Sequence, residues 1–194
     1  MHIYSNRGGD SMLKNNVVYF DSDGKMVDKL DIQQESCDRT IEYCATAIVP
    51  DGFTFRFTTF DSFTACSDLS ALVCMLEEQE AEGTVENPCG GTLTCPVAID
   101  AVRLVGTARF HINVGDLTPI EGGLQIGDIP CTLASDVSVP VNQVIQTICK
   151  TENCQGTCFD TVGAFAFAPQ VITDACGRQI VTIRGGVFLR FLGC

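Results

Sequence analysis

The sequence predicts an all-β protein: an antiparallel β-sandwich or jelly roll, with one short helix and a flexible N-terminal arm. Apolar and polar residues alternate with period two in several short segments, which is typical of strands with one buried and one solvated face. Turns rich in Gly, Pro and Asp separate these segments at short spacing, as in sandwiches and jelly rolls. With 194 residues and 45% hydrophobic residues, the chain is long and apolar enough for one such domain.

The N-terminal residues differ in character from the rest of the chain. Residues 1–15 are polar, contain the pair Gly8-Gly9 and show no periodic apolar face. We expect them to form a flexible arm, and residues 16–194 to form a single β-rich domain. Within that domain residues 16–31 predict a hairpin with its turn at Asp21-Ser22-Asp23-Gly24. These four residues also resemble the start of a calcium loop, but the later ligands are missing, so a turn is favoured over a cation site.

Strand patterns recur along most of the domain. Residues 53–57 alternate Phe with polar residues, and residues 108–114 alternate in the same way inside the longer segment 97–114. Gly106 interrupts that segment, as a bulge or bend would. The other predicted strands are Ile41–Val49, 124–129, 137–149, 160–168, 170–174, 178–184 and 186–192.

One segment breaks the alternation and predicts a helix over about 67–80. Its apolar residues follow the i, i+3, i+4, i+7 spacing of a helix face. They are Leu69, Leu72, Val73 and Leu76. Ser67 or Asp68 would cap this helix at its start and Gly83 would end it. Four glutamates lie near its end, which is unfavourable for the helix dipole, so we expect fraying there, or a cation or basic partner.

Charge restricts the classes of partner. The chain has 24 Asp and Glu against 12 Lys and Arg, a formal net charge of −12. Such a field repels nucleic-acid phosphates and anionic membrane surfaces, so we expect neither as a partner. No window approaches 18 consecutive apolar residues, so no membrane span is expected. The N-terminus has no apolar stretch of the length that an export signal needs, and we expect that the protein never had one.

The twelve cysteines are the most informative feature of the composition. They are Cys37, Cys44, Cys66, Cys74, Cys89, Cys95, Cys131, Cys149, Cys154, Cys158, Cys176 and Cys194. Their even number permits six bridges, but sequence does not give the connectivity. Many cysteines without an evident export signal fit assembly inside a cell that later lyses into an oxidising exterior.

The positions of some cysteines suggest how they pair. Cys89 and Cys95 bound a short loop that a local bridge could close. Cys66 and Cys74 bracket the start of the predicted helix, so each would pair elsewhere or across a bend. Cys194 follows Gly193 at the end of the chain, where it is placed to reach a neighbouring subunit, although pairing within its own subunit stays open.

Residues for catalysis or metal binding are not assembled in any recognised pattern. There is no Gly-x-Ser-x-Gly elbow, no phosphate-binding or dinucleotide fingerprint, and no carboxylate singled out by an apolar setting. His111 lies in an alternating strand and is expected to be solvated or edge-facing, with a catalytic or metal role as the alternative. Cys149, Cys154 and Cys158 are spaced loosely for zinc and lack a second knuckle, so disulfides are favoured over zinc. We therefore expect no enzyme, no cofactor and no metal.

The chain resembles the cysteine-rich spore-coat and spore-appendage proteins of endospore-forming Firmicutes. The features that carry the resemblance are the arm at 1–15, the β-rich body, the terminal Cys194 and the lack of an export signal. The segment Cys95–Val114 also looks like strands of clostridial surface proteins. The resemblance implies a jelly-roll subunit, made by the mother cell, whose N-terminal extension docks on neighbours and whose disulfides lock a fibre. One departure is that the first cysteine is Cys37, whereas appendage subunits carry cysteines in the arm itself.

Together these features predict a structural, self-assembling subunit of a disulfide-stabilised extracellular or spore-surface fibre or coat, whose partners are copies of itself. The arm would add a strand to the open sheet edge of a neighbour. The side chains expected to contact the neighbour are Tyr4, Val17, Val18, Tyr19 and Phe20. One alternative is a monomeric surface or phage-type adhesin module that binds through its loops. The other is a zinc-binding protein that uses Cys149, Cys154 and Cys158.

Overall fold

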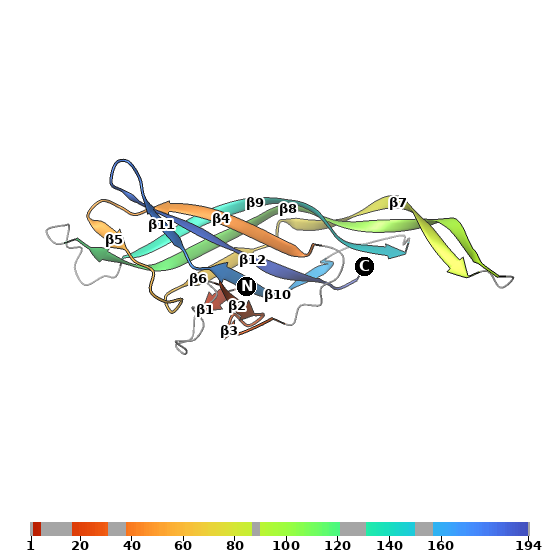
Figure 1. Cartoon of the computed structure of the whole chain (residues 1–194), viewed down its shortest axis with the longest axis horizontal. Helices are drawn as coiled ribbons and strands as arrows, with labels where there is room; N and C mark the ends of the chain where they lie inside the picture. Colours follow the sequence, from red (N-terminus) through yellow and green to blue (C-terminus); the bar gives the residue numbers. More distant parts are fainter. Residues whose placement is uncertain are drawn as a thin grey trace.

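The structure is a computed structural model that describes residues 2–4, 17–30, 38–86, 90–120, 131–149 and 157–193. These residues form two antiparallel six-stranded sheets that pack face to face (Figure 1). The predicted all-β class is therefore confirmed, and the arrangement is that of a β-sandwich. The predicted strand 124–129 lies outside the described residues.

The first sheet is built around one long strand, β8 (Thr92–Pro119). β9 (Thr132–Cys149) pairs with one edge of β8. Three strands follow one another along its other edge: β7 (Leu72–Glu86), β6 (Thr64–Asp68) and β5 (Phe53–Phe55). The short strand β1 (His2–Tyr4) pairs with the outer edge of β6. Each region of β8 therefore has a different partner on that side.

The second sheet is built around β12 (Gln179–Phe191). On one edge it pairs with β4 (Thr40–Ile48), and on the other with β10 (Phe159–Phe167) and β11 (Gln170–Thr173). β2 (Val17–Asp21) pairs with β10, and β3 (Met26–Val27) pairs with β2. β2 and β3 form the hairpin predicted within residues 16–31. The strands predicted separately at 178–184 and 186–192 are one continuous strand, β12.

The core lies between the two sheets and contains the inward half of each alternating strand. The largest side chains with under 2% exposure are Phe20, Phe63, Leu104, Ile112, Ile145 and Ile183. Each such side chain contributes about 1.5–3 kcal/mol through removal of apolar area from water. β4 shows the pattern most regularly, because its residues alternate between buried and exposed from Ile41 to Ile48. Period-two alternation was therefore a reliable sign of strands in this chain.

The helix predicted over 67–80 is wrong. Those residues end β6, make a tight turn and begin β7. The Asp68 side chain accepts hydrogen bonds from the backbone N–H and hydroxyl of Ser70 at 3.0 and 2.6 Å, which favours a turn over a helix start. The apolar positions also fit a period of two, since Leu72 is buried and Cys74 and Leu76 are half-buried on one face. Pairing with β8 along all 15 residues of β7 then overrides the helical spacing.

Gly106 lies where the partner of β8 changes from β7 to β6. Its φ of 137° is in the region that favours glycine, and an added Cβ would lie 2.2 Å from the carbonyl oxygen of Ala71. Any side chain at this position would therefore clash with the turn between β6 and β7. The register shifts of β8 against β9 lie elsewhere, at Val102/Arg103 and Asn113/Gly115, so Gly106 is a close-approach glycine rather than a bulge.

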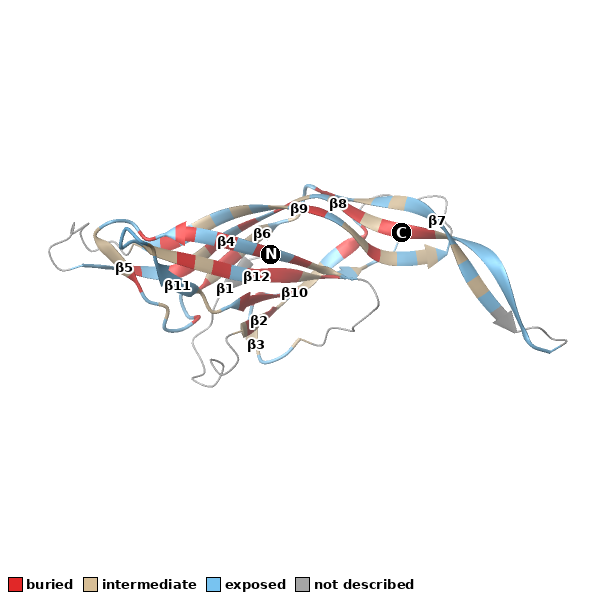
Figure 2. Cartoon of the chain, turned by 45° about the horizontal axis from the view of Figure 1, so that its top comes forward, coloured by how far each residue is buried: buried red, intermediate tan, exposed pale blue. Residues whose placement is uncertain are grey.

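β7 and β8 continue past the sandwich as a two-stranded extension. We call residues 77–86 and 90–99 the distal ribbon. The pairing between β8 and β9 ends at Ile99, opposite Cys149, so the strand residues beyond it pair only within the ribbon among the described residues. Figure 2 shows that the ribbon projects from one end of the molecule and is mostly exposed.

Candidate functional site

One buried disulfide joins the two sheets. Cys74 of β7 is bonded to Cys158, which directly precedes β10 and is 2% exposed. The two Cα atoms are 6.2 Å apart, and the residues are 84 apart in sequence. Disulfide formation, predicted from the cysteine content, is confirmed for this pair. Of the two alternatives for Cys74, pairing elsewhere or across a bend, the structure shows pairing elsewhere.

The Cys74–Cys158 disulfide also affects the hypothesis that Cys149, Cys154 and Cys158 bind zinc. Cys158 was one of its three proposed ligands, but its sulfur is covalently bonded to Cys74. Cys149 is exposed at the end of β9, and Cys154 lies outside the described residues. Across the described part of the chain there is also no group of three or more His, Cys, Asp or Glu side chains placed to hold a metal ion. Cys149 and Cys158 are therefore not brought together as thiolate ligands.

Four cysteines present unbonded thiols to solvent. Cys44 lies on the outer face of β4, opposite Arg184 of β12. Cys95 lies in the distal ribbon, Cys149 ends β9 and Cys176 lies in the turn between β11 and β12. The species that attacks a disulfide is the thiolate, which forms when an accessible thiol loses its proton. The molecule therefore carries oxidisable groups on four separate parts of its surface.

The remaining cysteines differ from these four. Cys66 in β6 and Cys131 before β9 are half-buried. Cys37, Cys89, Cys154 and Cys194 lie outside the described residues. Cys95 is unbonded, and Cys89, with which a local bridge was considered possible, lies outside the described residues.

The residues expected to dock on a neighbour are divided between the two sheets. Tyr4 belongs to β1, whose backbone pairs with β6 so that His2 is opposite Cys66 and Tyr4 opposite Thr64. Val18 and Phe20 of β2 are 2% and 0% exposed in the core of their own subunit, so their side chains are not available to a neighbour. Val17 and Tyr19 are half-buried on the outer face of the second sheet. Contact of Tyr4, Val17 and Tyr19 with a neighbour stays a prediction.

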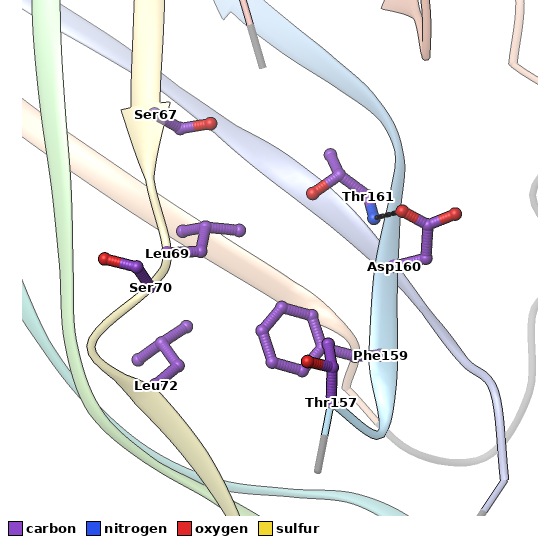
Figure 3. Close-up of a pocket in the computed structure, with 8 residues that line it drawn as sticks. All are labelled: Ser67, Leu69, Ser70, Leu72, Thr157, Phe159, Asp160 and Thr161. Atoms are coloured by element: carbon purple, nitrogen blue, oxygen red, sulfur yellow. Dashed lines mark hydrogen bonds between the residues drawn. The ribbon is translucent and has the colours of Figure 1, made fainter.

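A hollow of about 300 Å³ opens beside the disulfide, between the β6–β7 turn and the start of β10 (Figure 3). Its lining residues are Ser67, Leu69, Ser70, Leu72, Thr157, Phe159, Asp160 and Thr161. The carboxylate of Asp160 accepts hydrogen bonds from the backbone N–H of Thr161 at 2.8 Å and from Arg190 at 3.2 Å. Asp160, the only carboxylate among the lining residues that the structure describes, is thus already engaged.

His111 lies on the solvated outer face of the first sheet, as expected from the alternation. Its Nδ1 is 2.7 Å from Oδ1 of Asp136, in the adjacent strand β9. The two side chains are 55% and 83% exposed, so water screens this pair and its contribution to stability is small. Cys66 of β6 is opposite His111, which places Cys66, His111 and Asp136 in one row across three strands. Sequence alone gave no sign of Asp136, because the register between β8 and β9 is not readable from residue types.

Two hairpin turns use an aspartate in the same way. Oδ1 of Asp21 accepts hydrogen bonds from the backbone N–H groups of Asp23 and Lys25 at 3.0 and 2.9 Å. Oδ1 of Asp174 accepts the equivalent bonds from Cys176 and Arg178, both at 2.9 Å. The backbone hydrogen bond from Arg178 is the main cause that lowers the pKa of Asp174. The Asp21–Gly24 segment is therefore a turn, and the Asp21 oxygen that binds backbone N–H groups is not directed at a cation.

The described residues contain no helix with the length and apolarity needed to span a bilayer. Comparisons of the chain with protein-family models, with curated proteins and with solved structures found no match.

Proposed function

We propose that this chain is a structural, self-assembling subunit of an extracellular or spore-surface fibre or coat, stabilised by disulfides between subunits. The observation that carries the proposal is the set of four exposed, unbonded thiols at Cys44, Cys95, Cys149 and Cys176. These thiols lie on four different elements: β4, the distal ribbon, the end of β9 and the β11–β12 turn. Copies of the chain that meet in an oxidising environment can be crosslinked through them.

The position of β1 supports docking of the arm on a neighbour. β1 occupies the edge of β6 through a three-residue antiparallel ladder. The equivalent strand of a second copy can make the same hydrogen bonds, so exchanging one for the other costs little. The twelve residues 5–16 that connect β1 to β2 can span up to about 40 Å when extended. A head-to-tail contact of this kind builds fibres when its rotation does not close.

The composition is compatible with this role. A net charge of −12 keeps separate subunits soluble and apart. The buried Cys74–Cys158 bond fits a protein that functions where disulfides persist, which supports a location outside the cell or on a spore. Non-covalent docking would then bring subunits together, and oxidation would make the assembly slow to dissociate.

Electrophoresis of oxidised full-length protein with and without reductant, combined with negative-stain microscopy, tests the proposal. We expect a ladder of crosslinked species without reductant, a monomer band with reductant, and fibres or sheets in the micrographs. A variant with Ser at positions 44, 95, 149 and 176 should lose most of the ladder, whereas the matched change Ser138→Ala on β9 should retain it. A clean monomer band in both lanes, with no assemblies visible, would refute the proposal.

The hollow beside the disulfide favours a second candidate, a monomeric surface module that binds a glycan. Hydroxyl groups and the ring of Phe159 line it, a combination that suits the polar and apolar faces of a sugar. Its volume of about 300 Å³ is at the lower limit for a small-molecule site. Saturation-transfer NMR with simple sugars on wild-type protein and on Thr161→Ala tests this. Binding by a protein that stays monomeric after oxidation would favour the glycan module over the fibre subunit.

A further inference from the structure

Beyond Glu77, whose carboxylate is paired with Arg103 at the base of the ribbon, the distal ribbon has one face without charged residues. In an antiparallel pair, residues opposite one another project to the same side. The register places one set of such residues together, and we call them the uncharged face. They are Gln79, Ala81, Gly83, Leu93, Cys95, Val97 and Ile99. Leu93 and Val97 are 48% and 42% exposed, so this face presents apolar side chains to water.

The edges of the ribbon are unsuited to strand addition. Both edges lack a further partner among the described residues, and two strands alone are marginally stable in water. However, the β7 edge carries four glutamates within residues 77–82, and Pro96 interrupts the donors of the β8 edge. Charges and proline are the usual protection of an edge against pairing with another chain. A partner of the ribbon is therefore expected to approach its face rather than its edges.

The distribution of charge on the ribbon indicates which of its faces a partner would contact and what kind of partner this would be. Glu78, Glu80 and Glu82 alternate along β7 with residues of the uncharged face, so their side chains project from the opposite side of the ribbon. The sequence from 78 to 99 contains no Lys or Arg, so the ribbon beyond Glu77 offers one anionic side and one neutral side. A second copy that packs neutral side to neutral side leaves both rows of glutamates facing water and apart. Self-association through this face thus avoids the repulsion expected of a chain with a net charge of −12.

The area of the uncharged face determines whether non-covalent contact alone could hold two copies together. Residues 93–99 span roughly 24 Å, and two strands are about 10 Å wide, so the footprint is on the order of 250 Å². A stable interface buries about 800 Å² on each partner. The uncharged face is too small to hold two copies together without a further bond. Cys95 supplies a group for such a bond, because its thiol is exposed and unbonded between Leu93 and Val97.

We propose that the distal ribbons of two copies pack through their uncharged faces around a two-fold axis, and that a disulfide between the two Cys95 residues fixes the contact. At a two-fold axis a residue meets its own copy, so one thiol in each chain is sufficient. This inference rests on the proposed function and deepens it by naming one contact between subunits.

The bond forms by thiol–disulfide exchange with a low-molecular-weight disulfide. The Cys95 thiolate of one copy attacks a sulfur of that disulfide and releases one small thiol, leaving a mixed disulfide on the protein. The Cys95 thiolate of the second copy then attacks the Cys95 sulfur of the mixed disulfide and releases the second small thiol. Two protein thiols are oxidised, one small disulfide is reduced to two thiols, and their two protons pass to these products.

The test uses the full chain with oxidised glutathione as the disulfide, followed by electrophoresis without reductant and peptide mapping of the dimer. We expect a dimer in which two Cys95 peptides are joined. Cys95→Ser should abolish that species, whereas Cys44→Ser and Cys176→Ser, which remove exposed thiols elsewhere, should retain it. Cys149→Ser, at the base of the same face, should also retain it.

A second pair of variants separates face packing from random collision of an exposed thiol. Leu93→Asp keeps Cys95 but places a charge on the uncharged face, and should slow dimer formation roughly tenfold, the effect of about 1.4 kcal/mol. The control Glu80→Gln changes the opposite face and should form the dimer at least as fast as wild type. Crosslinking of Leu93→Asp at the wild-type rate, or a dimer that depends on Cys149 as much as on Cys95, would overturn the ribbon contact.

Failure of this inference is distinguishable from failure of the proposed function. Larger crosslinked assemblies that contain no joined Cys95 peptides would overturn the ribbon contact and leave the fibre subunit intact. A Cys95 dimer that forms no larger species, by electrophoresis or microscopy, would support the ribbon contact and contradict the fibre.

Discussion

The two ends of β8 have similar alternating patterns but opposite surroundings. In the sandwich, Phe110, Ile112 and Val114 are at most 2% exposed. In the distal ribbon, Leu93 and Val97 alternate with polar or small residues in the same way, yet they are 48% and 42% exposed. Phe110, Ile112 and Val114 lie on the face of β8 that packs against the second sheet, whereas Leu93 and Val97 have the opposite parity and lie on its outer face, in a ribbon that nothing described covers (Figure 2). Alternation specifies a strand with two unlike faces, but burial depends on what the rest of the chain places over one of them.

The largest effect is expected at the disulfide, close to where the covered and uncovered parts of β7 meet. Replacing both Cys74 and Cys158 with Ala should lower the free energy of unfolding by about 4.5 kcal/mol, the loop-entropy value for residues 84 apart. Urea denaturation of the double variant measures this loss, and Cys44→Ala should leave the midpoint nearly unchanged. A double variant as stable as wild type would show that the sheets hold together without the bond.

Matched leucine truncations on β8 test the comparison directly. Leu104 is 0% exposed, so Leu104→Ala should cost about 3–4 kcal/mol through lost burial and a residual cavity. Leu93→Ala in the ribbon should cost no more than about 0.5 kcal/mol, as for other surface substitutions. Chemical denaturation at low protein concentration measures both. Equal losses would mean that something covers the ribbon in the isolated protein.

Alkaline pH should weaken the sandwich through Tyr43. This side chain is 6% exposed and its ring centroid is 4.8 Å from that of Phe110, and burial raises the pKa of its phenol. The stability that its neutral form provides is therefore complete below the unfolded pKa of about 10 and is lost as pH rises, by up to about 1.4 kcal/mol per unit. Denaturation at several alkaline pH values should show this slope in wild type, and Tyr43→Phe should remove that part of it. A slope that survives unchanged in Tyr43→Phe would assign the effect to other groups.

The smallest effect is expected at the exposed turn of Asp174. Hydrogen bonds from the backbone of Arg178 lower the pKa of this carboxyl, so its contribution is present above about pH 3.9 and is lost as the pH falls through the folded pKa. NMR titration should give a pKa below the usual value, and Asp174→Asn should reduce the acid sensitivity of the turn without affecting the core. A normal titration would mean that the turn is open in solution.

The sequence patterns predicted most strands because period-two alternation and turn residues are local. They failed at residues 67–80, where apolar residues satisfy helical and strand spacing at once. Only the pairing of β7 with β8, a tertiary interaction, decides between them. β12 was predicted as two strands because Gly185-Gly186 reads as a break. In the structure both glycines lie within the sheet, and an added Cβ at Gly185 would lie 2.5 Å from the Tyr43 hydroxyl oxygen.

The candidate site was less predictable than the fold. The outward direction of Cys44 follows from alternation, since Tyr43 and Ala45 on either side of it are buried. By contrast, the pairing of Cys74 with Cys158 requires knowledge of how two sheets stack, which residue types do not encode. The exposed ribbon was also not predicted, although the positions of β7 that continue the inward parity of Leu72 and Leu76 are occupied next by Glu78, Glu80 and Glu82.

β8 runs without interruption from the sandwich to the ribbon. A mechanical force applied to the ribbon would therefore be transmitted to the sandwich through this strand. A pull on the ribbon along the strand acts perpendicular to the hydrogen bonds that join β8 to β9 and β6, so many of them resist together in shear. A pull across the strand would open the same ladder one bond at a time. The molecule is accordingly built to resist tension along its long axis far better than peeling from its side.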